Sequence, residues 1–461
     1  MEGLVTPIAR RRRVQSKPAS LPSTFSPYER FVVAMLAFLQ FTIILDFMIM
    51  GPLGALLLRD LHITTAQFGF AVSVYAWSAG ISGLLAAGFA DKFDRKKLLL
   101  FFYCGFLAGT LLCGLAGSYG VLLFARIVTG VFGGVVGSIA MAIIADLFPL
   151  AVRGRVMGTV QTAFAASQVL GLPLALYLSN HWGWQAPFIM VFAVSTAVGV
   201  IIALKLKPID AHLKVRSEHN PFQHLFKTLR QWRYLQTFAA TMLLATGGYM
   251  LMPFGSTFAV NNLGIPLARL PMLFMTTGVV AFVAGPRLGR LADRVGKYRV
   301  FCASSALAAT VVAIYCNLGV TPLGVVVLIN SVLFVAITAR MITAMALTSA
   351  VPDMQDRGAF MSVNSSLQQF SGGLASSVAG LIVVQRTDGH LVHYNLLGYV
   401  VAVAVGATVA LMYPIHKAVM AKAAASAASP LTAATGPDLG MGETPGSTEN
   451  GADGAMSADR P

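Results

Sequence analysis

The sequence has few charged residues and few cysteines for its length. Charged residues make up 11% of the 461 positions and hydrophobic residues 56%, whereas soluble domains carry about a quarter charged residues. This composition excludes an ordinary soluble enzyme, and the apolar content excludes disorder for most of the chain. Four cysteines are too few for a disulfide scaffold. All four lie in apolar runs, where we interpret them as small packing residues.

The residues that an enzyme site or a metal centre needs are also missing. Gly133 and Gly134 are not followed by the Lys-Ser/Thr of a phosphate-binding loop, so nothing indicates ATP-driven activity. Histidines such as His181, His212 and His219 are scattered in loops without the spacing of metal ligands. We therefore expect no catalysis, no metal and no cofactor.

Long apolar runs, in contrast, are abundant. Crossing a bilayer takes roughly 20 helical residues, and twelve runs are long enough. They lie near 31–58, 66–90, 98–117, 121–148, 156–179, 186–204, 236–260, 270–289, 300–317, 322–350, 360–384 and 392–413. Any one run alone is compatible with a buried core helix, but a soluble protein cannot cover twelve. Their length and the absence of two-residue alternation favour helices over a barrel, which predicts an all-α integral membrane protein with twelve transmembrane helices.

Positive charge is concentrated in alternate loops. One side holds 27 of the 33 lysines and arginines, and the other holds only Arg59, Arg269 and Arg386. Because cytoplasmic loops are rich in Lys and Arg, we expect both termini and the middle loop in the cytoplasm and the chain in the cell (inner) membrane. The net charge of +15 then reflects loops that face anionic lipid. No basic cluster is interleaved with base-stacking aromatics, so nucleic acid is not an expected partner.

A polar segment after the sixth run divides the chain. The predicted parts are a basic cytoplasmic tail (1–30), a six-helix bundle (31–204), a cytoplasmic linker (205–235), a second six-helix bundle (236–415) and a disordered cytoplasmic tail (416–461). In the linker, Asn220 and Pro221 form a good helix start. Apolar residues at helical spacing follow, which predicts an amphipathic helix on the membrane surface; a simple tether is a compatible alternative.

The two halves repeat each other. The stretch 87–97 reads AGFADKFDRKK and the stretch 289–299 reads GRLADRVGKYR, which places Asp91 and Asp293 202 positions apart. Arg153 and Arg357, each followed by Gly, are 204 positions apart. Both units begin on the same side of the membrane, so we expect parallel repeats related by an axis along the membrane normal.

These loop motifs resemble those of the major facilitator superfamily, and the resemblance covers about residues 30–415. The second half matches the pattern G-x-L-A-D-[RK]-x-G-[RK]-[RK] through Gly289, Asp293 and Gly296, whereas the first half has Ala87 and Asp94 in place of its glycines. The resemblance implies two pseudo-symmetric six-helix bundles that transport a solute by alternating access.

Further motifs are similar to those of bacterial drug:proton antiporters and predicted sugar-efflux proteins. Arg126 and the glycines that follow it resemble the superfamily's intramembrane Arg motif. The combination of Asp46 and Pro52 in the first span is also similar to that in these antiporters and efflux proteins. The antiporter signature of the fifth span is present only in part, through Gly171 and Pro173.

Asp46 is the only one of 18 acidic residues that lies well inside a span. A carboxylate at the membrane centre costs about 2.5–3.5 kcal/mol on the insertion scale. Arg126 falls at a height from which its side chain can reach Asp46. Burial disfavours a charged carboxyl whereas a nearby guanidinium favours it, so its protonation can respond to the surroundings. We predict Asp46 as the proton or substrate-cation site and Arg126 as its modulator; a static ion pair or a capped polar residue is the alternative.

Charged loop residues predict contacts that form when the cytoplasmic side closes. We expect Asp91 to cap a helix of the opposite half, Arg95 or Lys92 to pair with Asp146, and Asp293 to act like Asp91 near span five. The predicted gating residues are Asp91, Lys92, Arg95, Asp146, Arg153, Asp293, Arg294, Arg299, Asp353 and Arg357. Arg294 or Arg299 is expected to reach Asp353. Ordinary loop anchoring is the alternative for each.

Polar residues inside spans are candidates for lining a cavity between the halves. They are Gln40, Tyr75, Gln161, Gln168, Tyr249, Asn330, Arg340, Asn364 and Gln368. A hydrogen bond between packed helices also explains each of them, and Arg340 can snorkel to the surface. Four methionines are candidates for an adaptable apolar surface: Met48, Met50, Met250 and Met252.

The sequence therefore predicts a monomeric secondary transporter, not an enzyme, that exports amphipathic drugs or small organic solutes in exchange for protons. Its expected partners are a small-molecule substrate, protons and membrane lipid, and the proton gradient is its energy source. A proton-coupled importer or a lysolipid carrier of the same fold is one alternative. A non-transporting receptor or assembly partner is another, which the cost of burying Asp46 disfavours.

Overall fold

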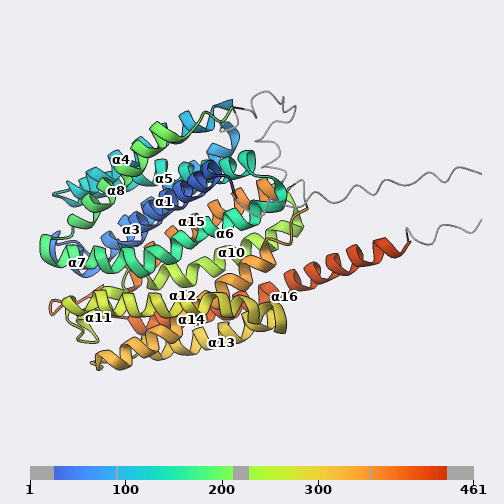
Figure 1. The fold of residues 1–461 in the computed structure, drawn as a ribbon. Helices are drawn as coiled ribbons and strands as arrows, with labels where there is room; N and C mark the ends of the chain where they lie inside the picture. Colours follow the sequence, from blue (N-terminus) through green and yellow to red (C-terminus); the bar gives the residue numbers. More distant parts are fainter. Residues whose placement is uncertain (1–24, 90–91, 211–227, 354–355, 433–461) are drawn as a thin grey trace, which may run out of the picture. The chain divides into compact units, whose positions relative to one another are not determined.

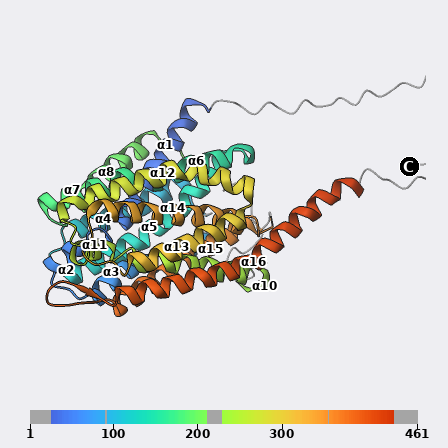
Figure 2. The same cartoon turned by 90° about the horizontal axis from the view of Figure 1, so that it is seen from below.

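The computed structural model describes residues 25–89, 92–210, 228–353 and 356–432, which are almost wholly α-helical. Long helices run side by side in both views (Figures 1 and 2). Eleven helices of the described part are long and apolar enough to cross a membrane. The twelfth long helix, α15, has 26 residues but is more polar, because it carries serines such as Ser371 and Ser376 that are buried against neighbouring helices. The predicted helical membrane fold is confirmed.

The first half contains six spans, two of which are divided. Its elements are α1 (Pro27–Met48), α2 (Gly54–Asp60), α3 (Thr65–Phe89), α4 (Arg95–Gly114), α5 (Tyr119–Leu147), α6 (Leu150–Ala166), the π-helical turn η2 (Ser167–Gly171), α7 (Leu172–Trp182) and α8 (Ala186–Lys205). The second half contains α10 (Trp232–Leu251), α11 (Gly255–Asn261), the short η4 (Leu267–Arg269), α12 (Leu270–Val295), α13 (Lys297–Tyr315), α14 (Leu323–Thr348), α15 (Arg357–Ile382) and α16 (Tyr394–Thr432).

We name the two ends of the bundle by what lies there. At the hairpin end, the strands β1 (Val384–Gln385) and β2 (Leu391–Val392) pair antiparallel; this small sheet is an exception to the predicted all-α fold. At the linker end, α1 begins, α8 and α12 end, and α10 begins.

The repeated loop motif is built differently in the two halves. Asp94, which stands where the motif has glycine, is the N-cap of α4, and its side chain accepts a hydrogen bond from the Lys96 N–H. Its counterpart 202 positions later, Gly296, joins α12 to α13 with φ of +109°, a conformation that favours glycine. The first half therefore replaces a flexible glycine with a side chain that stabilises the next helix.

Spans one and seven are interrupted at equivalent places, where the sequence predicted continuous runs. Pro52 lies between α1 and α2, and Pro253 lies 201 positions later between α10 and α11. Proline has no N–H for a helical hydrogen bond, which accounts for each break. The breaks contact each other, because the Ser256 hydroxyl donates to the Gly51 carbonyl at 2.7 Å. A Cβ added at Gly51 would lie 2.7 Å from the Met252 carbonyl oxygen, so the approach requires glycine. The two halves are thus joined at the hairpin end.

The Ser256–Gly51 hydrogen bond provides a first test of this contact. We expect Ser256→Ala to destabilise the closed hairpin end by about 1 kcal/mol, the net value of one hydrogen bond, and so to shift the closed population about fivefold. The readout is the rate at which an aqueous thiol reagent modifies Ala259→Cys, which is 1% exposed here. The matched control is Thr257→Val, because the buried Thr257 hydroxyl has no hydrogen-bond partner among the described residues. Equal rates in both variants would contradict the contact's role.

A second contact between the halves runs along α3 and α15. The Thr65 hydroxyl donates to the Val383 carbonyl at 2.6 Å near the hairpin end. The Ser73 hydroxyl donates to the Gly373 carbonyl at 2.6 Å further along. The Trp77 indole then donates to the Phe370 carbonyl at 3.2 Å. We call this contact the α3–α15 seam.

The C-terminal segment differs in part from the predicted disordered tail. Residues 416–432 continue α16, because the segment is rich in alanine, which has the highest helix propensity. By contacts, the chain divides into two compact units, Met1–His416 and Lys417–Pro461. Most of the predicted linker helix that starts at Asn220, the tail 1–24 and residues 433–461 lie outside the described residues.

Candidate functional site

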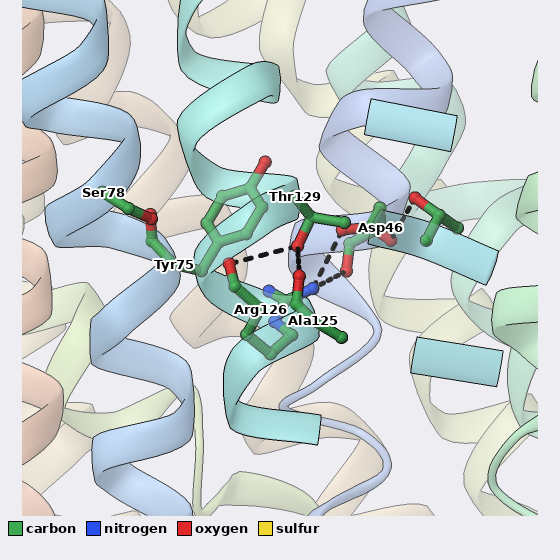
Figure 3. Close-up of polar contacts among 7 residues, drawn as sticks. Asp46, Tyr75, Ser78, Ala125, Arg126 and Thr129 are labelled. Carbon is green, nitrogen blue, oxygen red and sulfur yellow. Dashed lines mark hydrogen bonds and ion pairs between the residues drawn. The ribbon is translucent and has the colours of Figure 1, made fainter. Parts of the chain in front are cut away.

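A fully buried ion pair lies between α1 and α5. The Arg126 Nη1 donates to Asp46 Oδ2 at 2.9 Å and to the Asp46 backbone carbonyl at 3.2 Å. Both side chains are 0% exposed. Figure 3 shows the guanidinium of α5 directed at the carboxylate of α1. The sequence placed Asp46 and Arg126 at similar depths in their spans, and the structure shows that their side chains are in contact. Asp46 lies inside the protein and not on its lipid-facing surface.

Two further residues complete the surroundings of the pair. The Thr110 hydroxyl of α4 donates to Asp46 Oδ1 at 3.2 Å. The ring of Tyr75, on α3, lies 4.3 Å from the Arg126 guanidinium carbon, within range of a cation–π contact. Tyr75 was predicted as a cavity residue. Thr110 was not predicted, because a single hydroxyl in an apolar run has no distinguishing signal.

The guanidinium is only partly satisfied. Its Nε and Nη2 have no hydrogen-bond partner among the described residues, although arginine carries five N–H donors. A buried unpaired donor costs about 1–3 kcal/mol.

An aromatic row connects this pair to the second half. The Phe47 ring lies 5.2 Å from the Tyr75 ring and 5.6 Å from the Tyr249 ring of α10, measured between centroids. The Tyr249 hydroxyl donates to Gln369 Oε1 of α15 at 2.6 Å. Phe47 follows Asp46 directly in the chain, so the residue next to the carboxylate contacts the second half through packed rings. Phe47 was not predicted, because the sequence does not indicate which helices its ring touches.

The partial antiporter motif lies next to the pair. Ser167–Gly171 forms a π-helical turn in span five, a feature that often marks functional positions. A Cβ at Gly171 would lie 2.6 Å from the Leu45 side chain, and the Ser167 hydroxyl donates to the Phe41 carbonyl at 3.2 Å. Pro173 follows in the first turn of α7. The turn thus packs directly on the segment of α1 that carries Asp46.

The described residues of the second half contain no equivalent pair. At the repeat shift of 204, Asn330 stands where the first half has Arg126, and it is buried without an ion pair. Arg340, also on α14, donates from Nε to the Ser305 hydroxyl at 2.9 Å and is 6% exposed. No carboxylate pairs with it among the described residues. Within the part of the chain that the structure describes, a buried Asp–Arg pair inside the spans is therefore found in the first half only.

The remaining cavity candidates are dispersed. Gln161 on α6 is exposed, and Gln168 and Gln368 are partly buried. The amide oxygens of Gln40 and Asn364 are buried and have no partner among the described residues. Met48, Met50 and Met250 are buried in the core near the broken spans, and Met252 packs against it. Whether any of these contacts a substrate stays a prediction.

One of the predicted gating pairs is present. Arg95 Nε and Asp146 Oδ2 lie 2.9 Å apart, but they join α4 to α5 within the first half. Arg153 donates to the backbone carbonyls of Phe148 and Ala145. The role of these residues as a gate stays a prediction.

Three of the other gating residues, all in the second half, lie on the surface of the described part of the chain. Asp293, Arg294 and Arg299 are exposed and make no ion pair within the described part of the chain. The contact predicted for Arg294 or Arg299 is thus absent in this conformation. Lys92 is exposed, and the Asp353 N–H donates to the Tyr234 hydroxyl at 3.5 Å. Asp91 and the Arg357 side chain lie outside what the structure describes.

A helical membrane bundle of two repeated halves with a buried charge pair is typical of a secondary transporter, and comparison with known proteins agrees. The sequence profile of the Major Facilitator Superfamily matches residues 36–376. The chain therefore belongs to this superfamily, whose members are transporters and not enzymes. The chain is 26% identical over 270 residues to the uncharacterized MFS-type transporter YceJ of Bacillus subtilis (strain 168). The matched region covers 58% of this chain and 68% of YceJ.

Solved structures show the same fold. The chain is similar to a bacterial homologue of the human lysosomal transporter Spinster in its inward-facing, unoccupied conformation, with a TM-score of 0.64 and 15% identity. The occupied inward-facing structure gives a TM-score of 0.63 and 16% identity. Each match covers 86% of this chain and 97% of the other.

Proposed function

We propose that this protein is a proton-coupled antiporter that exports an amphipathic drug or small organic solute. Asp46 is the proton site and Arg126 is its counter-ion. The observation that carries the proposal is the fully buried ion pair between Asp46 and Arg126. In low dielectric the pair resists separation, so loss of the carboxylate charge on protonation changes the local energy far more than at a surface.

The proposed cycle follows from this electrostatic difference. While Asp46 is charged, it holds Arg126 and therefore joins α1 to α5. When Asp46 takes up a proton, the Coulomb attraction is lost, and the guanidinium turns to other acceptors. Because both side chains are fully buried in this conformation, proton exchange requires a second conformation in which water reaches the pair. The pair thus links protonation to a two-state equilibrium of the halves.

The proposal includes the membrane, the orientation and the partners of the protein. The linker end is cytoplasmic, as the distribution of lysine and arginine supports, and the protein works as a monomer in the cell inner membrane, without a cofactor. Its partners are the exported small molecule, protons and lipid. Export and not import is supported by the likeness of its motifs to drug:proton antiporters.

The direct experiment is transport in proteoliposomes with an imposed pH gradient. Purified protein is reconstituted, and a panel of drugs, sugars and lipids is tested for movement against the proton gradient. An equal substrate flux with and without the pH gradient would refute proton coupling. Substrate flux in the same direction as proton flux would refute antiport.

Phe47 gives a test of how the pair communicates with the second half. We expect Phe47→Ala to lower the proton-driven rate about tenfold, because it removes two aromatic contacts of about 0.5–1.5 kcal/mol each. The proton-to-substrate ratio, measured by pH-dye and substrate flux together, should fall as well. The matched control is Phe70→Ala, since Phe70 is 41% exposed and contacts only Trp77 of its own helix among the aromatic rings described. Equal rates in both variants would remove Phe47 from the coupling path.

A further inference from the structure

The first residues of the linker are bound to the first half of the protein. α8 ends at Lys205, and residues 206–210 adopt neither helix nor strand. The side chains of Leu206 and Ile209 are nevertheless buried, within the hydrophobic cluster that also contains residues of α1, α4 and α5. Burial of these apolar side chains favours the bound position. We call residues 206–209 the strap.

Polar groups of the loop between α3 and α4 hold the backbone of Ile209 on both sides. The Ile209 N–H donates to Asp94 Oδ1 at 3.3 Å, and the Ile209 carbonyl accepts from the Arg95 N–H at 3.1 Å. The same Asp94 Oδ1 accepts from the Lys96 N–H at 2.7 Å. Hydrogen bonds to a charged carboxylate are stronger than those between neutral groups. One carboxylate oxygen therefore caps α4 and anchors the strap at the same time.

Two lysines add contacts on either side of this anchor. The Lys207 N–H donates to the Tyr28 hydroxyl of α1 at 3.1 Å, and the Lys207 ammonium lies 5.1 Å from the centroid of the Tyr28 ring. Lys96 Nζ donates at 2.9 Å to the Ala203 carbonyl in the last turn of α8, where carbonyls have no partner within the helix. The strap and its neighbours therefore connect the linker-end termini of α1, α4 and α8.

Arg95 extends this connection to α5. Its backbone N–H binds the strap, and its side chain pairs with Asp146, with 2.9 Å between Nε and Oδ2. Arg95 is buried, so its side chain has little freedom to move independently of its backbone. A displacement of Ile209 therefore acts directly on the residue that forms the ion pair with α5.

The repeated second half provides an internal comparison. Gly296, the counterpart of Asp94, has no side chain with which to hold a strap. Residue 411, which matches Ile209 at the repeat shift of 202, lies inside α16, and this helix continues to Thr432. The described residues of the second half therefore form their spans without a counterpart of the strap. The superfamily motif also has glycine at the position of Asp94, so the motif does not imply the strap.

We propose that the strap is the element through which the linker acts on the first half. Asp94 engages the strap, and Arg95 transmits the position of the strap to Asp146 of α5. The hinge of the linker begins after Ile209 and not at the end of α8. Movement of the linker is therefore delivered to the Arg95–Asp146 pair, which makes the linker a control point for that pair. This role is independent of the substrate and of the coupling ion.

The test is amide hydrogen exchange of the intact protein in detergent, followed by mass spectrometry. Asp94→Ser keeps a good helix N-cap, but its shorter, neutral side chain does not reach the strap as well. We expect exchange to rise at least about fivefold in residues 206–210 and, together with them, in the last turn of α5 (144–147), because groups that open as one unit exchange together. The first turn of α13 (297–300) should not change. The matched control is Asp94→Asn, which keeps the length and an acceptor oxygen and should remain within about twofold of the unmodified protein.

A second variant approaches the same hydrogen bond from the strap. Ile209→Pro removes the N–H that Asp94 accepts and leaves Asp94 itself unchanged. We expect the same segments to exchange faster. Combining Ile209→Pro with Asp94→Ser should add little to either change alone, because both remove one shared contact.

Three outcomes would overturn the proposal. Unchanged exchange in residues 206–210 of Asp94→Ser would show that Asp94 does not hold the strap. Faster exchange there, with the last turn of α5 unchanged, would show that the strap does not act on the Arg95–Asp146 pair. An equal rise throughout α1 to α8 would make the strap a general stabiliser of the first half and not a link to one ion pair. Since the measurement needs no transport, its result does not depend on the proposed function.

Discussion

Asp46→Asn is expected to reduce proton-driven transport to the level of protein-free vesicles. The amide keeps the shape of the carboxyl and one acceptor oxygen, but it binds no proton in the physiological range. Substrate exchange without a pH gradient should persist, because exchange needs the two conformations and not the proton. The measurement is substrate flux with and without a pH gradient in the same vesicles.

Interpreting that variant requires a control for stability. Asp46→Asn removes the charge that faces Arg126, and an uncompensated buried charge itself destabilises a protein. The double variant Asp46→Asn/Arg126→Gln removes both charges and is the proper reference. If the double variant folds and exchanges substrate but ignores the pH gradient, the loss is one of coupling. Proton-driven flux at the normal rate in either variant would end the assignment of Asp46.

Arg126→Gln is expected to have the largest effect on stability. Among the described residues, Asp46 then remains buried with only the Thr110 hydroxyl as a side-chain partner. Breaking a buried ion pair by removing one partner costs about 3–5 kcal/mol. The measurement is thermal or denaturant unfolding of the detergent-solubilised protein, with the loss greatest at a pH where the carboxyl is charged.

The direction of the pH effect separates this result from general misfolding. Below the pH at which Asp46 takes up a proton, Arg126→Gln should recover stability, because a neutral carboxyl needs no counter-ion. Adding Asp46→Asn should restore stability at all pH values. The matched control is Arg340→Gln, since Arg340 is also buried in a span but donates to the Ser305 hydroxyl and to no carboxylate. A pH-independent loss in Arg126→Gln, or an equal pH profile in Arg340→Gln, would contradict the assignment.

The sequence predicted much of the fold because hydrophobic run length and charge placement are local properties. Twelve apolar runs indicated the helices, and the paired motifs at Asp91 and Asp293 indicated the duplication. Asp46 stood out because a carboxyl inside a span is rare and costly. These signals depend on neighbours along the chain and not on which helices touch.

Some predictions failed where a local pattern has two structural outcomes. The runs 31–58 and 236–260 read as continuous, but Pro52 and Pro253 divide each into two helices. The alanine-rich segment after residue 416 read as disordered, yet it is helical to Thr432. In both cases the composition indicated the kind of segment, apolar or rich in small residues. It did not indicate where a helix begins or ends.

Sequence alone determined that this chain is a duplicated helical membrane protein with one carboxyl and one guanidinium at matching depth. Only the tertiary structure decided that Asp46 pairs with Arg126 and that Arg340, which looks similar in sequence, faces Ser305. It also decided that α3 of the first half packs along α15 of the second half in the α3–α15 seam. The physical reason is that helical periodicity gives the face of each helix, whereas the partner of that face depends on packing between segments far apart in the chain.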